Sequence, residues 1–319
     1  MIVTINWKEV GDQLHLINYF MFVPCTALFA LHMLLRAYRW RALIPEGSKV
    51  PVRSLMDGLM LGNLATFILP LRAGEFVRPF IVTRQSGVPY ATGLVSVVIE
   101  RFFDLSAVLL SFGILLQFLE GIPSELYKGA VALSCMAAAI MIVMIIGSFA
   151  PAFVLNLLNL FLKHFPAKIS KKIRTFAEDF LKGAAVLKRP SALFMVIFLT
   201  VLVWVSNYFI FASYLSLVNV EPSVTRAVAV AVVLALAVAA PSAPGFLGVY
   251  QFASILGFAI FGLPREQAIA FGIVTHLYQY LLFLGYGAFA IIGGNVSCAD
   301  ITGASRKEQA VIKQLNETS

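Results

Sequence analysis

Long apolar stretches constrain the fold of this chain more than any other feature of its sequence. A bilayer core about 30 Å thick requires roughly 20 apolar helical residues. The stretches that meet this length are 15–35, 89–119, 129–150, 191–219 and 267–292. Charged residues make up 13% of the chain, about half of the roughly 25% that soluble domains carry. A soluble globule could not cover its surface with so few polar groups. The sequence therefore predicts an all-α, polytopic integral membrane protein.

Two further apolar regions are each interrupted by proline and glycine. Region 55–82 contains PLRAGE at 70–75, and region 227–262 contains PSAPG at 241–245. Proline removes a backbone donor and glycine loosens the backbone, so each interruption should end one helix and begin another. Each arm has about 15–17 residues, slightly fewer than a full crossing needs. We interpret both regions as re-entrant hairpins, and two ordinary spans joined by a tight turn are the alternative.

The spans and hairpins follow one another in a repeated order. Span, hairpin and span are followed by the extra central span 129–150, and then by span, hairpin and span again. The extra span turns the second triplet upside down. An inverted repeat with broken helices that meet near the midplane is typical of transporters. The expected organisation is one transmembrane domain with repeat halves and a polar tail: domain 1–292, halves about 15–119 and 191–292, tail 293–319.

The distribution of basic residues sets the expected orientation. Segments 36–58 and 151–190 carry five and eight Lys and Arg residues, whereas 120–128 and 220–226 carry one each. Basic loops face the cytoplasm, so the N-terminus should lie outside and the tail inside. The net charge of +8 then reflects cytoplasmic loops and anionic lipid rather than nucleic acid.

Residues 167–188 are predicted to form an amphipathic helix on the cytoplasmic leaflet. Apolar residues recur there at steps of three and four, and basic residues fill the remaining positions. Such a helix lies in the membrane interface. A target helix for a soluble partner is the alternative. The apolar positions are Ile169, Ile173, Phe176, Phe180, Ala184 and Leu187.

Charged residues within the apolar regions are the strongest candidates for function. A charge at the bilayer centre costs at least ~2.5–3.5 kcal/mol, so each needs a partner or a water-filled cavity. One interpretation is a salt-bridge network that locks the first hairpin to span 89–119. The other is that the arginines, with Glu75, also bind an anionic lipid headgroup, because a guanidinium matches phosphate oxygens and the helix expected at 73–85 offers its N-terminus. The residues are Arg72, Glu75, Arg78, Glu100, Arg101 and Asp104.

The second hairpin carries no charge at its tip. Residues Pro241, Pro244, Gly245 and Gly248 shape its backbone, and Gln251 and His276 offer polar contacts nearby. Uncapped backbone groups at this tip are tolerated where they face a polar cavity. His276 is either a hydrogen-bonded buried histidine or a proton carrier.

Signals for an enzyme are weak in this sequence. It contains no Ser/His/Asp set, no His-rich cluster and no glycine-rich nucleotide loop after a strand. The cysteines Cys25, Cys135 and Cys298 show neither a disulfide framework nor metal-ligand spacing. We therefore expect no cofactor, no metal and no enzymatic activity. An acid/base pair formed by Glu100 and Asp104 stays open as the alternative.

Several motifs occur in an order that resembles a known membrane family. They are RAYRWR at 36–41, the stretch from Asn63 to Glu75, Arg78, ERFFD at 100–104 and PGFLG at 244–248. Over about residues 7–292 the chain resembles the flippase-like family named after the transmembrane region of lysylphosphatidylglycerol synthase. In multiple peptide resistance factors, this region is associated with moving aminoacylated phosphatidylglycerol between leaflets, while a separate soluble domain attaches the amino acid.

The chain also departs from that family's pattern. Gln251 stands where a glutamate is frequent and His276 where an arginine is frequent, so the resemblance does not imply a lysyl-lipid substrate. The soluble domain is not expected, because only the polar tail follows Ile292. Relatives often have one more span before Asn6-Trp7-Lys8-Glu9, so an additional N-terminal span stays open.

From these observations we expect a lipid translocator in the cell membrane. Its substrate would be an anionic or modified phospholipid or a polyprenyl-phosphate-type lipid. Membrane lipids are the expected partners, nucleic acid is not, and a homo-oligomer is left open. The alternatives are a membrane-embedded enzyme or accessory subunit of lipid or glycolipid synthesis, and a small-solute transporter.

Overall fold

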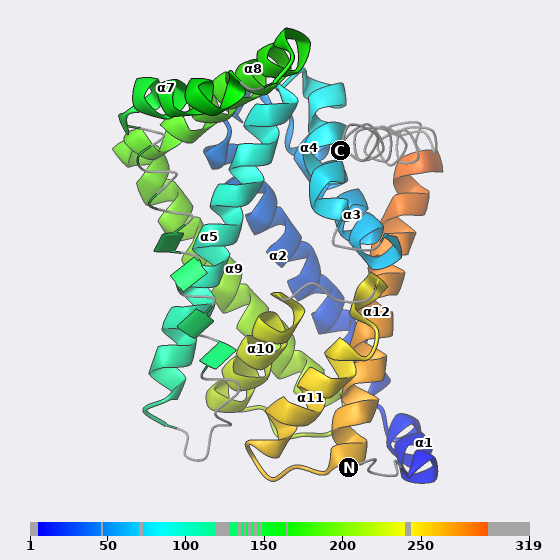
Figure 1. The fold of residues 1–319 in the computed structure, drawn as a ribbon. Helices are drawn as coiled ribbons and strands as arrows, with labels where there is room; N and C mark the ends of the chain where they lie inside the picture. Colours follow the sequence, from blue (N-terminus) through cyan, green and yellow to red (C-terminus); the bar gives the residue numbers. More distant parts are fainter. Residues whose placement is uncertain are drawn as a thin grey trace.

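The computed structural model forms a bundle of helices (Figure 1). It describes residues 6–45, 47–69, 73–118, 150–163, 165–239 and 244–292, together with isolated positions between 128 and 149. No strand occurs in this part of the chain. Helical segments long and apolar enough to cross a membrane are Tyr19–Leu43, Pro190–Leu217 and Arg265–Ile292. The predicted class, an all-α integral membrane protein, is confirmed.

Four long helices form the frame of the bundle. They are α2 (Phe22–Leu43), α5 (Tyr90–Leu115), α9 (Pro190–Leu217) and α12 (Arg265–Ile292). Helix α5 has 26 residues and so is ~39 Å long at 1.5 Å per residue, but charged side chains lie near its middle. The predicted central span 129–150 and the tail 293–319 lie largely or wholly outside the described residues.

The two broken regions are pairs of short helices. The first pair is α3 (Val52–Ile68) with α4 (Gly74–Ser86), and the second is α10 (Val224–Ala239) with α11 (Val249–Ala259). Arms of 11 to 17 residues are ~16–26 Å long, shorter than the ~30 Å bilayer core. The pairs occupy opposite ends of the bundle (Figure 1).

The inner ends of the two helix pairs touch. A short 3-10 turn, η5 (Pro244–Phe246), packs against α3, and the ring centroids of Phe67 and Phe246 lie 6.2 Å apart. Short arms that enter from opposite ends and meet in the interior support re-entrant hairpins. The equivalence of the two halves as an inverted repeat stays a prediction.

Two glycines allow the arms of the first hairpin to cross closely. A Cβ atom on Gly62 would overlap the side chain of Arg78 and lie 3.0 Å from the carbonyl oxygen of Gly74. A Cβ atom on Gly74 would overlap the carbonyl oxygen of Gly62. Close backbone approach through small residues is the usual packing mode of membrane helices. It fixes α4, and with it the side chains of Glu75 and Arg78, against α3.

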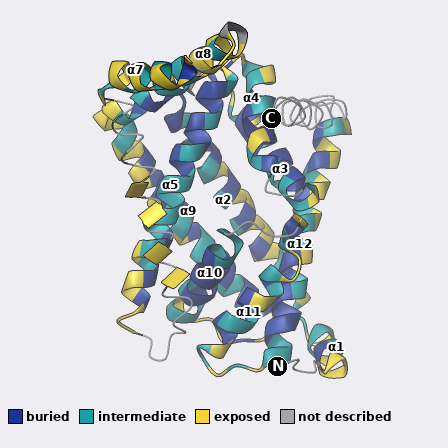
Figure 2. Cartoon of the chain, in the orientation of Figure 1, coloured by how far each residue is buried: buried dark blue, intermediate teal, exposed yellow. Residues whose placement is uncertain are grey.

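Two helices lie across one end of the bundle (Figure 1). Helix α8 (Ala167–Ala184), with the 3-10 turn η4 (Ala185–Lys188), covers the range expected for the amphipathic helix. Helix α7 (Pro151–Leu162) differs from the prediction of a basic connection at 151–190 that contains one helix. Both helices are largely exposed (Figure 2). In α7 the exposed side chains include Phe153, Leu157, Leu160 and Phe161, which suits a membrane interface.

The remaining short elements lie at the ends of the long helices. A nine-residue helix, α1 (Trp7–His15), packs against α12 at the end opposite α8 (Figure 1). The 3-10 turn η1 (Tyr19–Met21) leads into α2, and η2 (Gly47–Lys49) connects α2 to α3. The first hairpin packs against α2, α5 and α12 through α3 and α4, and the second packs against α5, α9 and α12 through α10 and α11.

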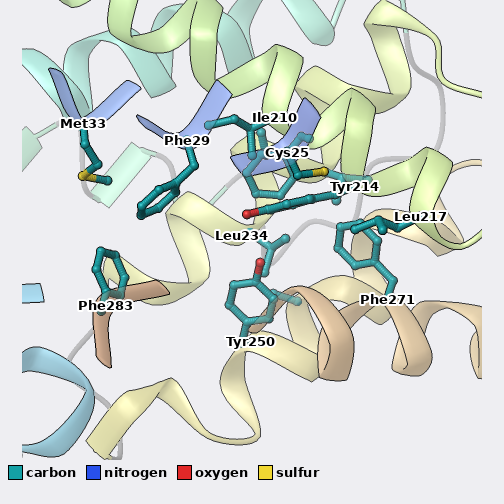
Figure 3. Packing of buried hydrophobic residues seen from close by; sticks show 14 of the residues in the cluster. Cys25, Phe29, Met33, Ile210, Tyr214, Leu217, Leu234, Tyr250, Phe271 and Phe283 are labelled. Atoms are coloured by element: carbon teal, nitrogen blue, oxygen red, sulfur yellow. The ribbon is translucent and has the colours of Figure 1, made fainter. Parts of the chain in front are cut away.

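The main hydrophobic core is formed by residues of α2, α9, α10, α11 and α12 together with both arms of the first hairpin, α3 and α4 (Figure 3). Phe29, Tyr214 and Phe283 are buried in this cluster. Figure 3 shows the hydroxyl groups of Tyr214 and Tyr250 turned toward the same space beside Leu234. The core therefore surrounds an interior space that also receives polar atoms.

Candidate functional site

The carboxylate of Glu100, in the middle of α5, is the centre of a buried charge cluster. Its side chain is 0% exposed. Oε1 accepts hydrogen bonds of 3.1 Å from Nη2 of both Arg36 and Arg101, and Oε2 accepts one of 2.8 Å from Nη2 of Arg78. Nη2 of Arg39 lies 3.3 Å from Oε1. Four guanidinium groups from three helices thus surround one carboxylate, which compensates the cost of burying its charge.

Two further carboxylates extend the cluster on either side. Asp104 Oδ1 accepts hydrogen bonds from Arg39 Nη1 at 2.6 Å and from Trp204 Nε1 at 3.3 Å. Its Oδ2 lies 3.5 Å from Arg101 Nη1. Glu75 contacts Arg78 at 3.2 Å and Arg101 at 3.5 Å. Within the described residues, the connected cluster contains four arginines and three carboxylates, an excess of one positive charge.

Arg36 and Arg39 belong to this cluster, which corrects the sequence analysis. The first span was expected to end at residue 35 and to be followed by a cytoplasmic connection. Helix α2 instead begins at Phe22 and continues to Leu43, and Arg39 is 0% exposed. The three-residue spacing of the two arginines, which puts them on one helix face, was the available signal. The signal was missed because the six charged residues predicted to lie in the interior, three positive and three negative, already balanced one another and needed no further partner.

A cavity of about 240 Å³ lies beside the cluster, between the two hairpins and the long helices. Its charged lining residues are Arg36, Glu75 and Arg101. Aromatic side chains from several helices also line it. Neutral polar side chains complete the lining: His32, Asn63, Thr66, Asn207 and Gln279. The cavity is therefore lined by charged, neutral polar and aromatic groups.

Among the described residues, three that line the cavity, Asn63, Arg101 and Tyr214, have a buried side-chain polar atom without a hydrogen-bond partner. The side-chain nitrogen Nδ2 of Asn63 is buried and has no such partner among the described residues. Leaving a buried donor unpaired costs about 1–3 kcal/mol, and a ligand with acceptor oxygens would satisfy it. His32 differs, because its Nδ1 lies 3.0 Å from Ser206 Oγ.

The structure divides the predicted headgroup-binding residues into two groups. Glu75 and Arg101 line the cavity. Arg78 is 1% exposed, is held by Glu75 and Glu100, and packs with its guanidinium 4.8 Å from the centre of the Trp40 ring. Arg72 lies outside the described residues. Headgroup binding by these side chains stays a prediction.

The predicted residues of the second hairpin shape and support its tip. Gly245 has φ of +65°, and a Cβ atom there would lie 2.8 Å from the carbonyl oxygen of Phe67, so only glycine fits. Gly248 has φ of +80°, and its N–H donates to Gln251 Oε1 at 2.9 Å at the start of α11. Pro244 begins η5, and Pro241 lies outside the described residues.

His276 has the surroundings of a packed aromatic side chain. It is buried, its ring stacks on that of Tyr250 with centroids 4.6 Å apart, and its Nδ1 lies 3.4 Å from Gln251 Nε2. Tyr250 in turn lines the cavity. Its Nε2 is buried without a hydrogen-bond partner among the described residues, so both interpretations of His276 stay open. Among the described residues, no group of three or more His, Cys, Asp or Glu is placed to hold a metal ion.

Comparisons with known proteins find a membrane protein and a glycosyltransferase among the relatives of this chain. The chain is 26% identical over 237 residues to UPF0104 membrane protein MJ1078 of Methanocaldococcus jannaschii, which covers 72% of this chain and 94% of that protein. It is 32% identical over 72 residues to Glycosyltransferase AglD of Haloferax volcanii, which covers 22% of this chain and 12% of that protein. No solved structure matches.

A family model identifies the chain over most of its length. The model describes the lysylphosphatidylglycerol synthase TM region and matches residues 1–287. The match includes both hairpins, the charge cluster and the cavity. This integral membrane protein therefore belongs to the family of the lysylphosphatidylglycerol synthase TM region.

Proposed function

We propose that this protein moves a lipid with an anionic headgroup between the two leaflets of the membrane. The observation that carries the proposal is the cavity between two short hairpins, which is lined by charged residues and by aromatic residues. A lipid likewise has a charged head and an apolar remainder. Membership of a membrane family named after a lipid synthase supports a lipid as the substrate.

The geometry favours transport over chemistry at the carboxylates. A general acid or base must reach a substrate proton within hydrogen-bond distance. Both oxygens of Glu100 already accept hydrogen bonds from arginines, and its side chain is 0% exposed. Asp104 Oδ1 is likewise occupied by Arg39 and Trp204. Glu100 therefore positions arginines and offers no open proton acceptor, whereas Oδ2 of Asp104 has only the 3.5 Å contact with Arg101 Nη1.

A role in glycolipid synthesis is the second candidate function. It is favoured by the short match to a protein named a glycosyltransferase. That match covers 12% of the relative, so for this chain we propose the lipid-binding part of such a synthesis and not the glycosyl transfer itself. Both candidates thus require the chain to bind a lipid, and only the first requires the lipid to change leaflet.

Lipid movement by the purified protein in liposomes tests the proposal. Liposomes carry fluorescent phosphatidylglycerol in both leaflets, and dithionite bleaches the outer leaflet only. Without movement about half of the label is protected. We expect most of the label to be bleached in vesicles that contain the protein. Protection of half of the label at high protein density would reject the translocator.

A variant pair separates the cavity from the remainder of the protein. Ala235 lines the cavity, whereas Ala288 is exposed on α12. Ala235→Phe should fill the cavity and slow lipid movement, and Ala288→Phe should leave it unchanged. Equal rates in the two variants, at equal melting temperature, would exclude this cavity as the lipid path.

A further inference from the structure

We propose that the four arginines around Glu100 have two different tasks. Arg36 and Arg101 bind the phosphate group of the lipid, and Arg39 and Arg78 hold Glu100 in place. This assignment rests on the proposed function and deepens it, because it names the ligand group and the side chains that contact it. The same chemistry would also bind a free phosphate, so both sources are compared below.

Exposure divides the four arginines into these two pairs. The side chains of Arg36 and Arg101 are 12% and 37% exposed, and both line the cavity. Those of Arg39 and Arg78 are 0% and 1% exposed, and neither lines it. A ligand in the cavity can therefore reach only the first pair directly.

The hydrogen bonds of Glu100 show how the first pair can be released. Oε1 accepts from both Arg36 and Arg101, while the nearby Nη2 of Arg39, at 3.3 Å, has no hydrogen-bond partner among the described residues. Three donors thus converge on one oxygen. If a phosphate takes over Arg36 and Arg101, Arg39 can bond to Oε1 while Arg78 keeps Oε2. Glu100 then stays paired throughout.

The charge of the cluster matches an anionic ligand. Its described members carry one excess positive charge, and an added phosphodiester, with one negative charge, would neutralise it. Asn63, which lines the same cavity, supplies a further buried donor, Nδ2, without a partner among the described residues. Guanidinium groups bind phosphate through paired, charge-assisted hydrogen bonds. Two arginines and one amide therefore form a donor set for the oxygens of a phosphate ester.

A binding experiment tests the two tasks without requiring transport. The purified protein in detergent is titrated with dihexanoylphosphatidylglycerol, with dihexanoylglycerol, which lacks the phosphate, and with inorganic phosphate. The variants are Arg36→Lys and Arg101→Lys, which keep the charge but lose the forked geometry. The matched control is Arg174→Lys, an exposed arginine of α8. Asn63→Ala is a further variant that leaves all charges in place.

We expect Arg36→Lys and Arg101→Lys each to raise the Kd for the phospholipid about tenfold or more, as the loss of a charged hydrogen bond implies. Asn63→Ala should raise it several-fold, and Arg174→Lys should not. Unchanged Kd in Arg36→Lys and Arg101→Lys, or equally tight binding of dihexanoylglycerol, would overturn the assignment. If inorganic phosphate binds as tightly as the phospholipid, the bound phosphate group need not belong to a lipid, and that part of the proposal is overturned. Binding as expected without lipid movement would reject the proposed function and leave this site intact.

Discussion

Replacing Glu100 by glutamine should destabilise the protein more than any comparable change at its surface. The substitution keeps the shape of the side chain and removes its charge. Four guanidinium groups lie within 3.3 Å of the Glu100 oxygens, and two of them belong to side chains that are 0% and 1% exposed. Removing one partner of a buried ion pair costs about 3–5 kcal/mol. Because the substitution breaks several ion pairs together, we expect the free energy of unfolding to fall by an amount at the upper end of this range.

A surface carboxylate provides the control for this prediction. Glu178 pairs with Arg174 at 3.0 Å on α8, and the two side chains are 37% and 54% exposed. An exposed pair contributes only about 0–1 kcal/mol, so Glu178→Gln should unfold almost as the parent does.

The difference in stability between the two variants is measured by unfolding both in detergent. Tryptophan fluorescence is recorded as a function of temperature and of denaturant concentration. A Glu100→Gln protein as stable as Glu178→Gln would refute the reasoning. It would mean that water or counter-ions solvate the arginines without Glu100.

Two further predictions concern packing and orientation. Gly62→Ala should lower the free energy of unfolding by about 1–3 kcal/mol, because the added methyl group overpacks against α4. Gly113→Ala is the control, because there is open space around its added methyl group. Equal unfolding transitions of the two variants would contradict the close crossing of α3 and α4. In a background without native cysteines, a cysteine at the exposed Lys171 of α8 should resist a membrane-impermeant reagent in intact cells, and a cysteine at the exposed Ser223 should react. The reverse labelling pattern would invert the predicted orientation.

The sequence predicted the helix pairs because their signals are local. Proline and glycine at 70–74 and 241–245 interrupt apolar regions, and the structure has helices on both sides of each interruption. The amphipathic stripe of α8 is likewise a local pattern, with apolar residues on one face. Helix boundaries differ by a few residues, because end residues depend on contacts that local patterns do not record.

Contacts between distant segments could not be predicted in the same way. Arg39 pairs with Asp104, which is 65 positions away in the sequence, and a basic residue after an apolar stretch ordinarily marks the end of a span. That rule fails here because carboxylates of α5 reach the same depth and compensate the charge. Helix α7 was missed for a different reason. Its apolar residues lie beside a strongly basic segment, and the basic residues dominated the interpretation of 151–190.

The two halves of the chain contribute different chemistry to the cavity. All of its charged wall residues, Arg36, Glu75 and Arg101, come from α2, α4 and α5 in the first half. The second half supplies apolar and neutral polar side chains, as the lack of charge at its hairpin tip suggests. An anionic group bound as we propose is therefore held on the side of the first half, because only there can its charge be paired. The apolar remainder of the lipid then faces the aromatic side chains, which both halves supply. The site is therefore asymmetric, because all of its charged residues belong to the first half although each half contributes one hairpin.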